Sequence, residues 1–207
     1  QIQPEEQSQQ FEPENIPLDI IFEDDHILVI NKPSGLVVHP AAGNWSGTLL
    51  NGLLHYLPFS KGLPRAGIVH RLDKNTTGLM VIAKDEVSQN HLVRQLQSKK
   101  VKREYRAIVW GQVWKNKSIS QPIGRHPRVR VKMAVNKING KDSITHYEVL
   151  ERFGMNSYLR CNLETGRTHQ IRVHMQFNES PIVGDPVYGL KKIIPTKSMS
   201  PNLKKAT

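Results

Sequence analysis

The sequence predicts an α+β fold, in which a central mixed, largely antiparallel sheet is flanked by helices and loops. Short runs of alternating or β-branched apolar residues recur along the chain and are joined by turn-forming segments. A few segments between them carry leucines at helical spacing. With 207 residues, the chain is long enough to bury a sizeable core.

The first half is expected to hold a hairpin and two helices. Residues 19–22 and 26–30 are apolar runs separated by three acidic residues, which is a hairpin signal. Residues 48–57 have leucines at helical spacing, with Ser46 or Thr48 as the N-cap. Asp85 is expected to cap a second helix that runs to about Lys99.

The second half is expected to be rich in strands. Residues 101–113 alternate, which puts Tyr105, Ala107 and Val109 on one face. Residues 121–135 read as a basic loop or irregular ribbon, and residues 143–151 and 158–163 as two strands. Thr168 is expected to start a short helix through Phe177.

The chain divides into three parts by composition. Residues 1–15 are rich in Gln, Glu and Pro, which predicts a disordered linker. Residues 16–190 are expected to form one domain, and residues 191–207 a basic tail with scattered lysines. Because the sequence starts at Gln1 and not at Met, we expect a processed chain or a fragment.

The formal charge of +11 favours a polyanionic partner, since each basic side chain near a phosphate releases counterions. No apolar run approaches the roughly 18 residues of a membrane-spanning helix, so a membrane partner is not expected. The single cysteine, Cys161, alternates with Leu159 and Leu163 and is read as a buried strand residue. It indicates a reducing compartment, and we expect a cytoplasmic monomer.

The most informative segment is residues 67–84, which we expect to form strand, loop and strand. Its loop carries the tetrapeptide His70-Arg71-Leu72-Asp73. Loops on a rigid scaffold are common positions for catalytic groups. The spacing alone leaves open a surface loop with a local ion pair.

This segment closely resembles the catalytic motif of the RluA-type pseudouridine synthases. Residues 102–111 resemble the tyrosine-bearing strand of that family, and residues 163–174 its second arginine motif. The resemblance extends from about Asp19 to Gly189 and includes residues 31–35 and 184–189. Three further stretches are most similar to the branch that acts on large-subunit ribosomal RNA, namely residues 64–67, 124–127 and 133–135.

The resemblance implies an RNA pseudouridine synthase, an isomerase, and assigns a role to each matching residue. Asp73 is the catalytic carboxylate, either as nucleophile or as base. Arg172 is its counter-charge, and Arg167 is the alternative for that role. Tyr105 stacks on the uracil and is a candidate for the C5 proton step. Arg71 replaces the flipped uridine in its stack, and His70 beside it contributes to substrate binding.

A basic stretch alternates charged with apolar residues. Arg125, Arg128, Arg130 and Lys132 would lie on one side of a strand or ribbon there and contact RNA phosphates. The alternative is a solvated charged loop.

We expect neither a metal nor an organic cofactor. The chain has nine histidines but no His-Glu-x-x-His motif, no paired cysteines and no phosphate-cradling glycine loop. The reaction implied by the resemblance is an isomerisation without electron transfer. Members of this branch usually carry a small RNA-binding module upstream of such a linker and a strand-forming segment after the matched region. This sequence contains neither, so we expect a catalytic domain that is truncated at its C-terminal end.

Three alternatives to this function stay open. A relative that modifies transfer RNA would carry the same residues. A catalytically silent RNA-binding domain would keep the basic loops but lose Asp73 or Tyr105, and both are present. A glycosidase would need a second carboxylate paired with Asp73, and none lies near it in the sequence.

Overall fold

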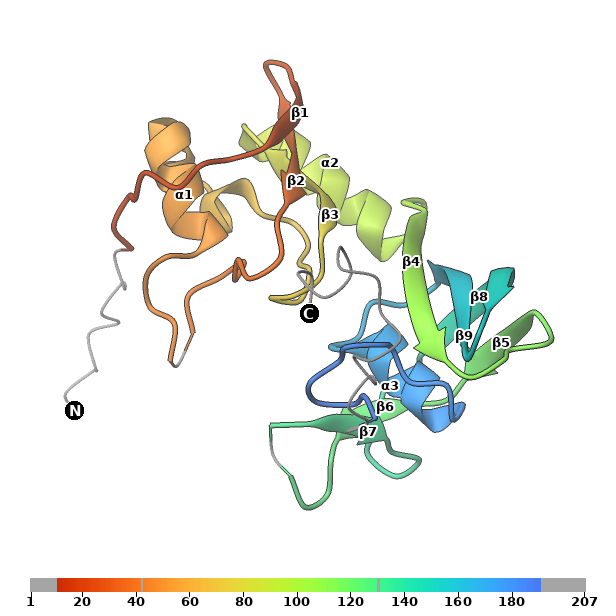
Figure 1. The fold of residues 1–207 in the computed structure, drawn as a ribbon. Helices are drawn as coiled ribbons and strands as arrows, with labels where there is room; N and C mark the ends of the chain where they lie inside the picture. Colours follow the sequence, from red (N-terminus) through yellow and green to blue (C-terminus); the bar gives the residue numbers. More distant parts are fainter. Residues whose placement is uncertain (1–10, 42, 130, 191–207) are drawn as a thin grey trace, which may run out of the picture. The chain divides into compact units, whose positions relative to one another are not determined.

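The computed structural model describes residues 11–41, 43–129 and 131–190. The chain divides into two compact units, Gln1–Val101 and Lys102–Thr207 (Figure 1). The α+β class is confirmed, because helices accompany sheets whose paired strands are antiparallel. Most of the predicted linker and the whole basic tail lie outside the described residues.

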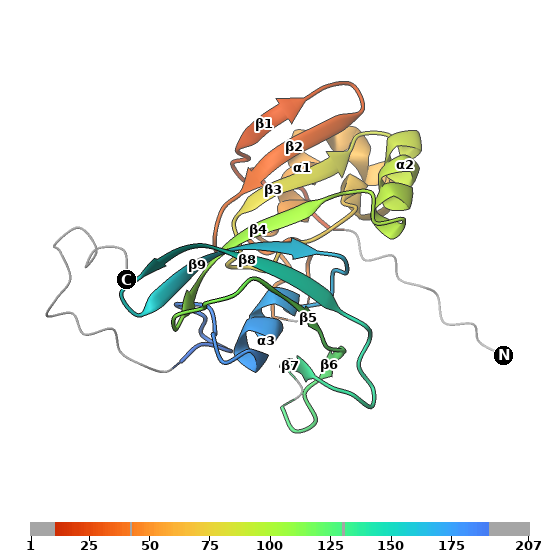
Figure 2. The same ribbon diagram turned by 90° about the vertical axis from the view of Figure 1, so that its right-hand side faces the viewer.

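The first unit contains a three-stranded sheet in the order β1-β2-β3, with α1 behind it in Figure 2. The strands are β1 (Ile20–Glu23), β2 (Ile27–Lys32) and β3 (Gly78–Ala83). The predicted hairpin is confirmed, and Asp24 Oδ1 closes its turn by accepting the amides of His26 and Ile27 at 2.8 and 2.7 Å.

Both helices of this unit begin where the sequence predicts. Helix α1 (Leu49–Tyr56) has Thr48 as its N-cap, with the Thr48 amide donating to Asn51 Oδ1 at 3.1 Å. Helix α2 (Glu86–Gln97) is capped by Asp85, whose Oδ1 accepts the Ser88 amide at 2.8 Å. Two 3₁₀ turns, Pro58–Gly62 and Pro64–Gly67, follow α1.

The predicted strand at residues 67–69 is wrong. Only Ile68 forms a bridge, with Ile82 of β3. Arg65 and Ala66 both have left-handed backbone conformations, with φ of 55° and 52°, and Gly67 follows with φ of 79°. The chain therefore enters the catalytic-motif loop from a tight turn and not from a strand.

The second unit contains a four-stranded antiparallel sheet in the order β4-β9-β8-β5. The strands are β4 (Arg103–Trp110), β5 (Lys117–Ser120), β8 (Ile144–Phe153) and β9 (Asn156–Leu163). Strand β5 was not predicted, because Ile119 is its only apolar residue. Val109, Leu159 and Cys161 are fully buried in the core, and burial raises the pKa of the Cys161 thiol to about 12.

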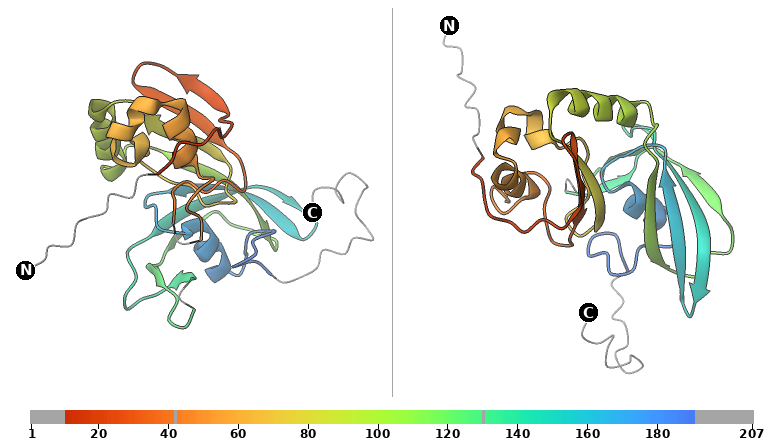
Figure 3. Two further views of the ribbon diagram at one scale, coloured as in Figure 1. Left: turned by 90° about the vertical axis from the view of Figure 1, so that its left-hand side faces the viewer. Right: turned by 90° about the horizontal axis from the view of Figure 1, so that it is seen from above.

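Helix α3 (Gln170–Phe177) lies on one face of this sheet (Figure 3). Strands β6 (Ile123–Arg125) and β7 (Met133–Val135) form a two-stranded ribbon. Met175 of α3 packs into the core of the four-stranded sheet, and Val173 of α3 packs against Ile123 of the ribbon. The predicted helix start at Thr168 is wrong by one position. The N-cap is His169, which has a left-handed backbone with φ of 57°.

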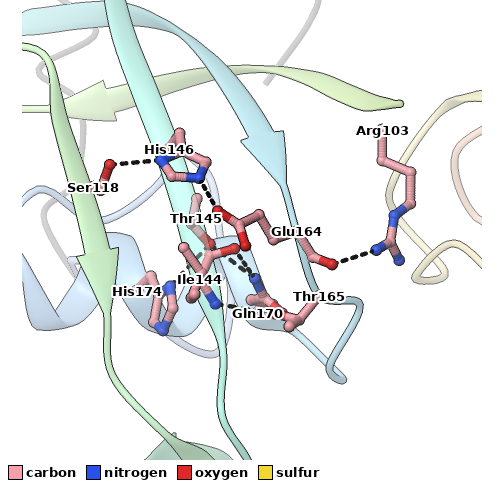
Figure 4. A network of polar contacts seen from close by, with 9 residues as sticks. All are labelled: Arg103, Ser118, Ile144, Thr145, His146, Glu164, Thr165, Gln170 and His174. Carbon is pink, nitrogen blue, oxygen red and sulfur yellow. Dashed lines mark hydrogen bonds and ion pairs between the residues drawn. The ribbon is translucent and has the colours of Figure 1, made fainter. Parts of the chain in front are cut away.

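Polar side chains connect α3 to the sheet in a continuous network (Figure 4). His174 is fully buried, and its Nε2 donates to the Gln121 carbonyl at 3.0 Å while its Nδ1 lies 2.9 Å from the Thr145 hydroxyl. Gln170 Nε2 donates to the same hydroxyl and to the Ile144 carbonyl, both at 3.0 Å. Burial lowers the pKa of the His174 imidazole despite the opposing backbone hydrogen bond, which favours the neutral ring.

We expect His174 to make the stability of the protein depend on pH. Its pKa in the folded state is lower than in the unfolded state, so its contribution is present above the unfolded pKa of about 6.5 and is lost as the pH falls through the folded value. Thermal unfolding between pH 8 and pH 5 should therefore show a steeper loss of stability in wild type than in His174→Gln. His91→Gln, a change at an exposed position on α2, should keep the wild-type slope.

Candidate active site

The loop that carries the predicted catalytic motif is held at both ends. Leu72 is 7% exposed and anchors the loop between Arg71 and Asp73. The Val81 amide of β3 donates to His70 Nε2 at 3.1 Å. At the other end, the Thr76 amide donates to the Asp73 carbonyl at 3.0 Å. The side chains of Arg71 and Asp73 are thus presented by a short, fixed segment.

The contact from Val81 also gives His70 a structural role. A ring nitrogen that accepts a hydrogen bond from a backbone N–H cannot itself carry a proton. Nε2 of His70 is therefore unprotonated, and the ring proton lies on Nδ1. The imidazole that the family resemblance assigns to substrate binding therefore also fixes the loop to β3.

Lys32 is fully buried next to this loop. Its ammonium donates to the carbonyls of Pro33, Leu36 and Lys74 at 2.7, 2.9 and 3.0 Å, which satisfies all three of its donors. Burial lowers the pKa of Lys32, and the nearby charge of Asp73 opposes this shift. Lys32 therefore joins the end of β2 to the residue that follows Asp73, and places a positive charge near the carboxylate.

We expect Lys32→Met to destabilise the first unit by about 3 kcal/mol, because the carbonyls of Pro33, Leu36 and Lys74 lose the ammonium that joins them. Chemical denaturation monitored by circular dichroism measures this. Lys74→Met is a matched control, since the Lys74 side chain is exposed and only its backbone carbonyl contacts Lys32. Equal stabilities of the two variants would contradict the role of Lys32.

In the second unit, Arg172 of α3 forms a bidentate ion pair with Asp185. Arg172 Nε lies 2.6 Å from Asp185 Oδ2, and Arg172 Nη2 donates to Asp185 Oδ1 at 3.0 Å. The side chains are only 18% and 3% exposed. Burial opposes ionisation of Asp185, but the hydrogen bonds from Arg172 and from the amides of Tyr188 and Val187 lower its pKa overall.

Tyr188 completes the support of Arg172. The guanidinium carbon lies 4.9 Å from the centre of the Tyr188 ring, a cation–π contact. The Tyr188 hydroxyl accepts the Met133 amide at 2.8 Å and lies 2.9 Å from His169 Nδ1. The guanidinium is therefore fixed in the plane set by Asp185 and against the ring of Tyr188.

The other predicted residues of this unit differ in burial. Tyr105 is half-buried on β4 and packs against the core of the four-stranded sheet. Arg167 is exposed, and its Nε donates to the Asp142 carbonyl at 3.1 Å. Of the two arginines considered for the counter-charge, Arg172 is thus the fixed and largely buried one.

The basic stretch forms the ribbon that the sequence predicts, but its charges lie mostly in the connecting loop. Arg125 ends β6, whereas Arg128 lies in a turn whose amides at residues 128 and 129 donate to His126 Nδ1. Both arginines are exposed. Lys132 is half-buried and donates to the Val187 carbonyl at 2.9 Å, and Arg130 lies outside the described residues.

Sequence reasoning assigned no role to Lys32, Asp185 or Tyr188. A signal for Lys32 was present, because it follows Leu28 and Ile30 in the buried phase of an alternating strand. Asp185 and Tyr188 lie in the matched stretch 184–189, but their link to Arg172 is visible only in three dimensions.

No three His, Cys, Asp or Glu side chains gather at a point that could hold a metal ion, within the part of the chain that the structure describes. In the same residues, no helix has the length and apolar character needed to cross a bilayer.

Comparison with known proteins identifies the family. The family model for RNA pseudouridylate synthase matches residues 26–177. Two curated relatives, both named ribosomal large subunit pseudouridine synthase D, come from Neisseria meningitidis serogroup B and Escherichia coli. The Neisseria protein is 58% identical over 91% of this chain and 50% of its own length. The Escherichia coli protein is 55% identical over 89% of this chain and 56% of its own length. The chain thus spans about half the length of these relatives.

Solved structures agree with this result. Human RNA pseudouridylate synthase domain containing 1 superposes with a TM-score of 0.69 and 27% identity, covering 84% of this chain and 71% of its own. Human RNA pseudouridylate synthase domain containing 4 has a TM-score of 0.65 and 27% identity, covering 90% and 75%. By the match of its family model over most of its length, the chain belongs to the RNA pseudouridylate synthase family.

Proposed function

We propose that the chain is the catalytic part of an RNA pseudouridine synthase that isomerises specific uridines in a stem-loop of large-subunit ribosomal RNA. The observation that carries this proposal is the intact loop at residues 70–73 in a chain that is 55–58% identical to proteins named ribosomal large subunit pseudouridine synthase D. The formal charge of +11 suits a polyanionic substrate.

The reaction breaks the bond between uracil N1 and ribose C1′, rotates the base, and forms a bond between C5 and C1′. The proton on C5 is removed and N1 gains one, so the product is an isomer of the substrate. Asp73 supplies the carboxylate, as nucleophile or base, next to C1′. The fixed loop around it would hold that carboxylate in place while the base turns.

The remaining roles follow the family motifs. Arg172 serves as the counter-charge of Asp73, and its support by Asp185 and Tyr188 suits a fixed cation. Tyr105 stacks on the uracil and takes part in the C5 proton step. Arg71 replaces the target uridine in its stack, where a planar guanidinium can both stack and donate hydrogen bonds, and His70 beside it contributes to substrate binding. Arg167 contacts RNA.

We place the enzyme in the cytoplasm as a monomer that binds ribosomal RNA, without a membrane partner. The isomerisation exchanges no electrons, so we propose that it needs neither a metal nor an organic cofactor.

The test is to map pseudouridines in cells that lack the gene for this protein. Loss of pseudouridine from large-subunit ribosomal RNA, restored by the wild-type gene, is the expected result. Loss from transfer RNA alone would favour the relative that modifies transfer RNA. An unchanged map of both RNAs would contradict the proposal.

We expect the β6–β7 ribbon to contribute to RNA affinity through phosphates. Neutralising Arg125, Arg128, Arg130 and Lys132 should weaken binding for every RNA sequence. The slope of log affinity against log salt should fall by roughly 0.7–0.9 for each phosphate that the protein no longer neutralises. Lys132 should contribute least, because its ammonium also donates to Val187. Filter binding at several salt concentrations measures the slope.

A matched control removes the same number of positive charges at another exposed position of the second unit. Arg125→Gln/Arg128→Gln should be compared with Lys115→Gln/Lys117→Gln, which removes two exposed charges near β5. If both double variants change the slope equally, the ribbon has no special role in RNA binding.

A further inference from the structure

The first unit contains a pocket that is lined at one end by His70 and Arg71 and elsewhere by residues to which the proposed chemistry gives no role. Its volume is about 750 Å³, within the range of roughly 300–1,000 Å³ that is typical of ligand sites. Buried apolar side chains contribute to its lining, namely Leu50, Leu54 and Ile68, which are 4%, 8% and 3% exposed. Phe11 and the ring of His39 also line it, so aromatic surface is available beside the apolar one.

Cations surround this apolar surface. Lys61, Arg65 and Arg71 all line the pocket and are exposed, and none of the described residues that line it is acidic. His39 lines the same pocket as Arg65 and Arg71; burial lowers the pKa of its imidazole, and the charges of these two arginines lower it further. A pocket with apolar and aromatic walls and only positive charges suits a ligand with a flat ring and an anionic group.

The backbone that carries Arg65 is strained and braced. Arg65 and Ala66 are consecutive non-glycine residues in the left-handed region, a conformation that costs free energy and tends to occur at functional sites. Gly67 passes so close to β3 that an added Cβ would lie 2.0 Å from the Ala83 carbonyl oxygen. Gln89 of α2 donates to the Pro64 carbonyl at 2.8 Å. The turn therefore holds Arg65 at the pocket against local preference.

The pocket is also continuous with the catalytic-motif loop. His70 and Arg71 line it, and Asp73 follows two residues after Arg71. An RNA strand that delivers a uridine to Asp73 would bring a neighbouring nucleotide to this pocket. The stretch 64–67 resembles one branch of the family, but the proposed chemistry gives it no role.

We propose that this pocket is a second RNA subsite, which takes one unpaired nucleotide next to the target uridine. The base lies against the apolar and aromatic wall, and the phosphate lies against Arg65, which leaves Arg71 for the stack. The inference rests on the proposed function, because it assumes an RNA substrate for the neighbouring loop.

The first experiment needs no turnover. The full chain is titrated with adenosine 5′-monophosphate, uridine 5′-monophosphate and ribose 5-phosphate while the imidazole signals of His39 are followed by NMR. Saturable shifts with both nucleotides, and at least about fivefold weaker binding of ribose 5-phosphate, are expected. Arg65→Gln should weaken nucleotide binding about tenfold or more. Arg94→Gln, an exposed arginine of α2 outside the pocket, should not.

The second experiment uses stem-loop RNA and separates binding from folding. Arg65→Gly removes the side chain and suits the left-handed backbone, so its thermal midpoint should match or exceed that of wild type. We expect its KM for the stem-loop to rise about tenfold with kcat within about twofold, and Arg65→Lys to recover part of the loss. A single abasic position beside the target uridine should weaken binding by wild type more than binding by Arg65→Gly, in which the nucleotide is already held less tightly.

The outcomes distinguish this inference from the proposed function. If wild type makes pseudouridine and Arg65→Gly has the KM of Arg94→Gln, the subsite is absent and the function stands. If wild type binds the mononucleotides in the pocket and also binds the stem-loop, but makes no pseudouridine, the proposed function fails and the RNA subsite stands. If no nucleotide shifts the His39 signals, or if Arg65→Gln and Arg65→Gly bind the nucleotides as tightly as wild type, the inference is overturned.

Discussion

Asp73→Asn is expected to abolish pseudouridine formation while RNA affinity stays within a few fold of wild type. Asp73 is the only carboxylate in the loop 70–73, and asparagine keeps its shape but is neither a nucleophile nor a base. The expected loss of turnover is at least about a thousandfold. A tritium-release assay on uridine-labelled transcript measures turnover, and filter binding measures affinity.

The control for this variant is Asp25→Asn, the same change at an exposed position in the turn between β1 and β2. It should retain wild-type turnover. Thermal unfolding of both variants shows whether the loop remains folded. Substantial turnover by a folded Asp73→Asn protein would remove Asp73 from the mechanism.

Local patterns predicted the elements that local forces determine. The acidic run at residues 23–25 leads into the expected turn between β1 and β2 because Asp24 accepts the amides of His26 and Ile27. Asp85 begins α2 because its carboxylate accepts the Ser88 amide in the first turn. Thr48 begins α1, and its amide donates to the Asn51 side chain in the first turn. The predicted alternation of residues along β4 is confirmed, because one face of the strand packs on the core and the other face does not.

The elements that the sequence could not predict depend on distant parts of the chain. The left-handed turn at Arg65 and Ala66 contradicts local preference and is held by β3 and α2. Arg172 and Asp185 are 13 positions apart, and no local pattern links a helix residue to a loop carboxylate at that spacing. Lys32 has the alternation of a core residue, but its three carbonyl partners come from two loops.

The same dependence explains why the motif resemblance found the candidate residues but not their supports. Loops 33–36 and 74–75 contact each other through Gly35, whose amide donates to the Lys74 carbonyl at 2.9 Å, and through Lys32. One matched stretch thus holds another in place. In the second unit, the stretch 184–189 does the same for α3 through Asp185 and Tyr188. A matched stretch whose residues take no part in the proposed reaction can therefore hold in place another stretch whose residues do.

Arg172→Ala is expected to cost more stability and more activity than Arg167→Ala. It leaves the buried carboxylate of Asp185 without its cation, and breaking such a pair costs about 3–5 kcal/mol. Arg167 is exposed and loses only a hydrogen bond to the Asp142 carbonyl. Denaturation midpoints and single-turnover rates of both variants test this ranking, and the reverse ranking would move the counter-charge role to Arg167.

Asp185→Asn separates a positioning role from a purely structural one. Asparagine keeps the shape of Asp185 but removes the charge that orients Arg172, so we expect kcat to fall about tenfold or more with little change in KM. The lowered pKa of Asp185 means that its contribution to stability is present above the unfolded pKa of about 3.9 and is lost as the pH falls through the folded value. The stability difference between wild type and Asp185→Asn should therefore be full at pH 7 and shrink in acid. A difference that stays constant down to pH 2, or an unchanged kcat, would show that Asp185 does not hold Arg172 through its charge.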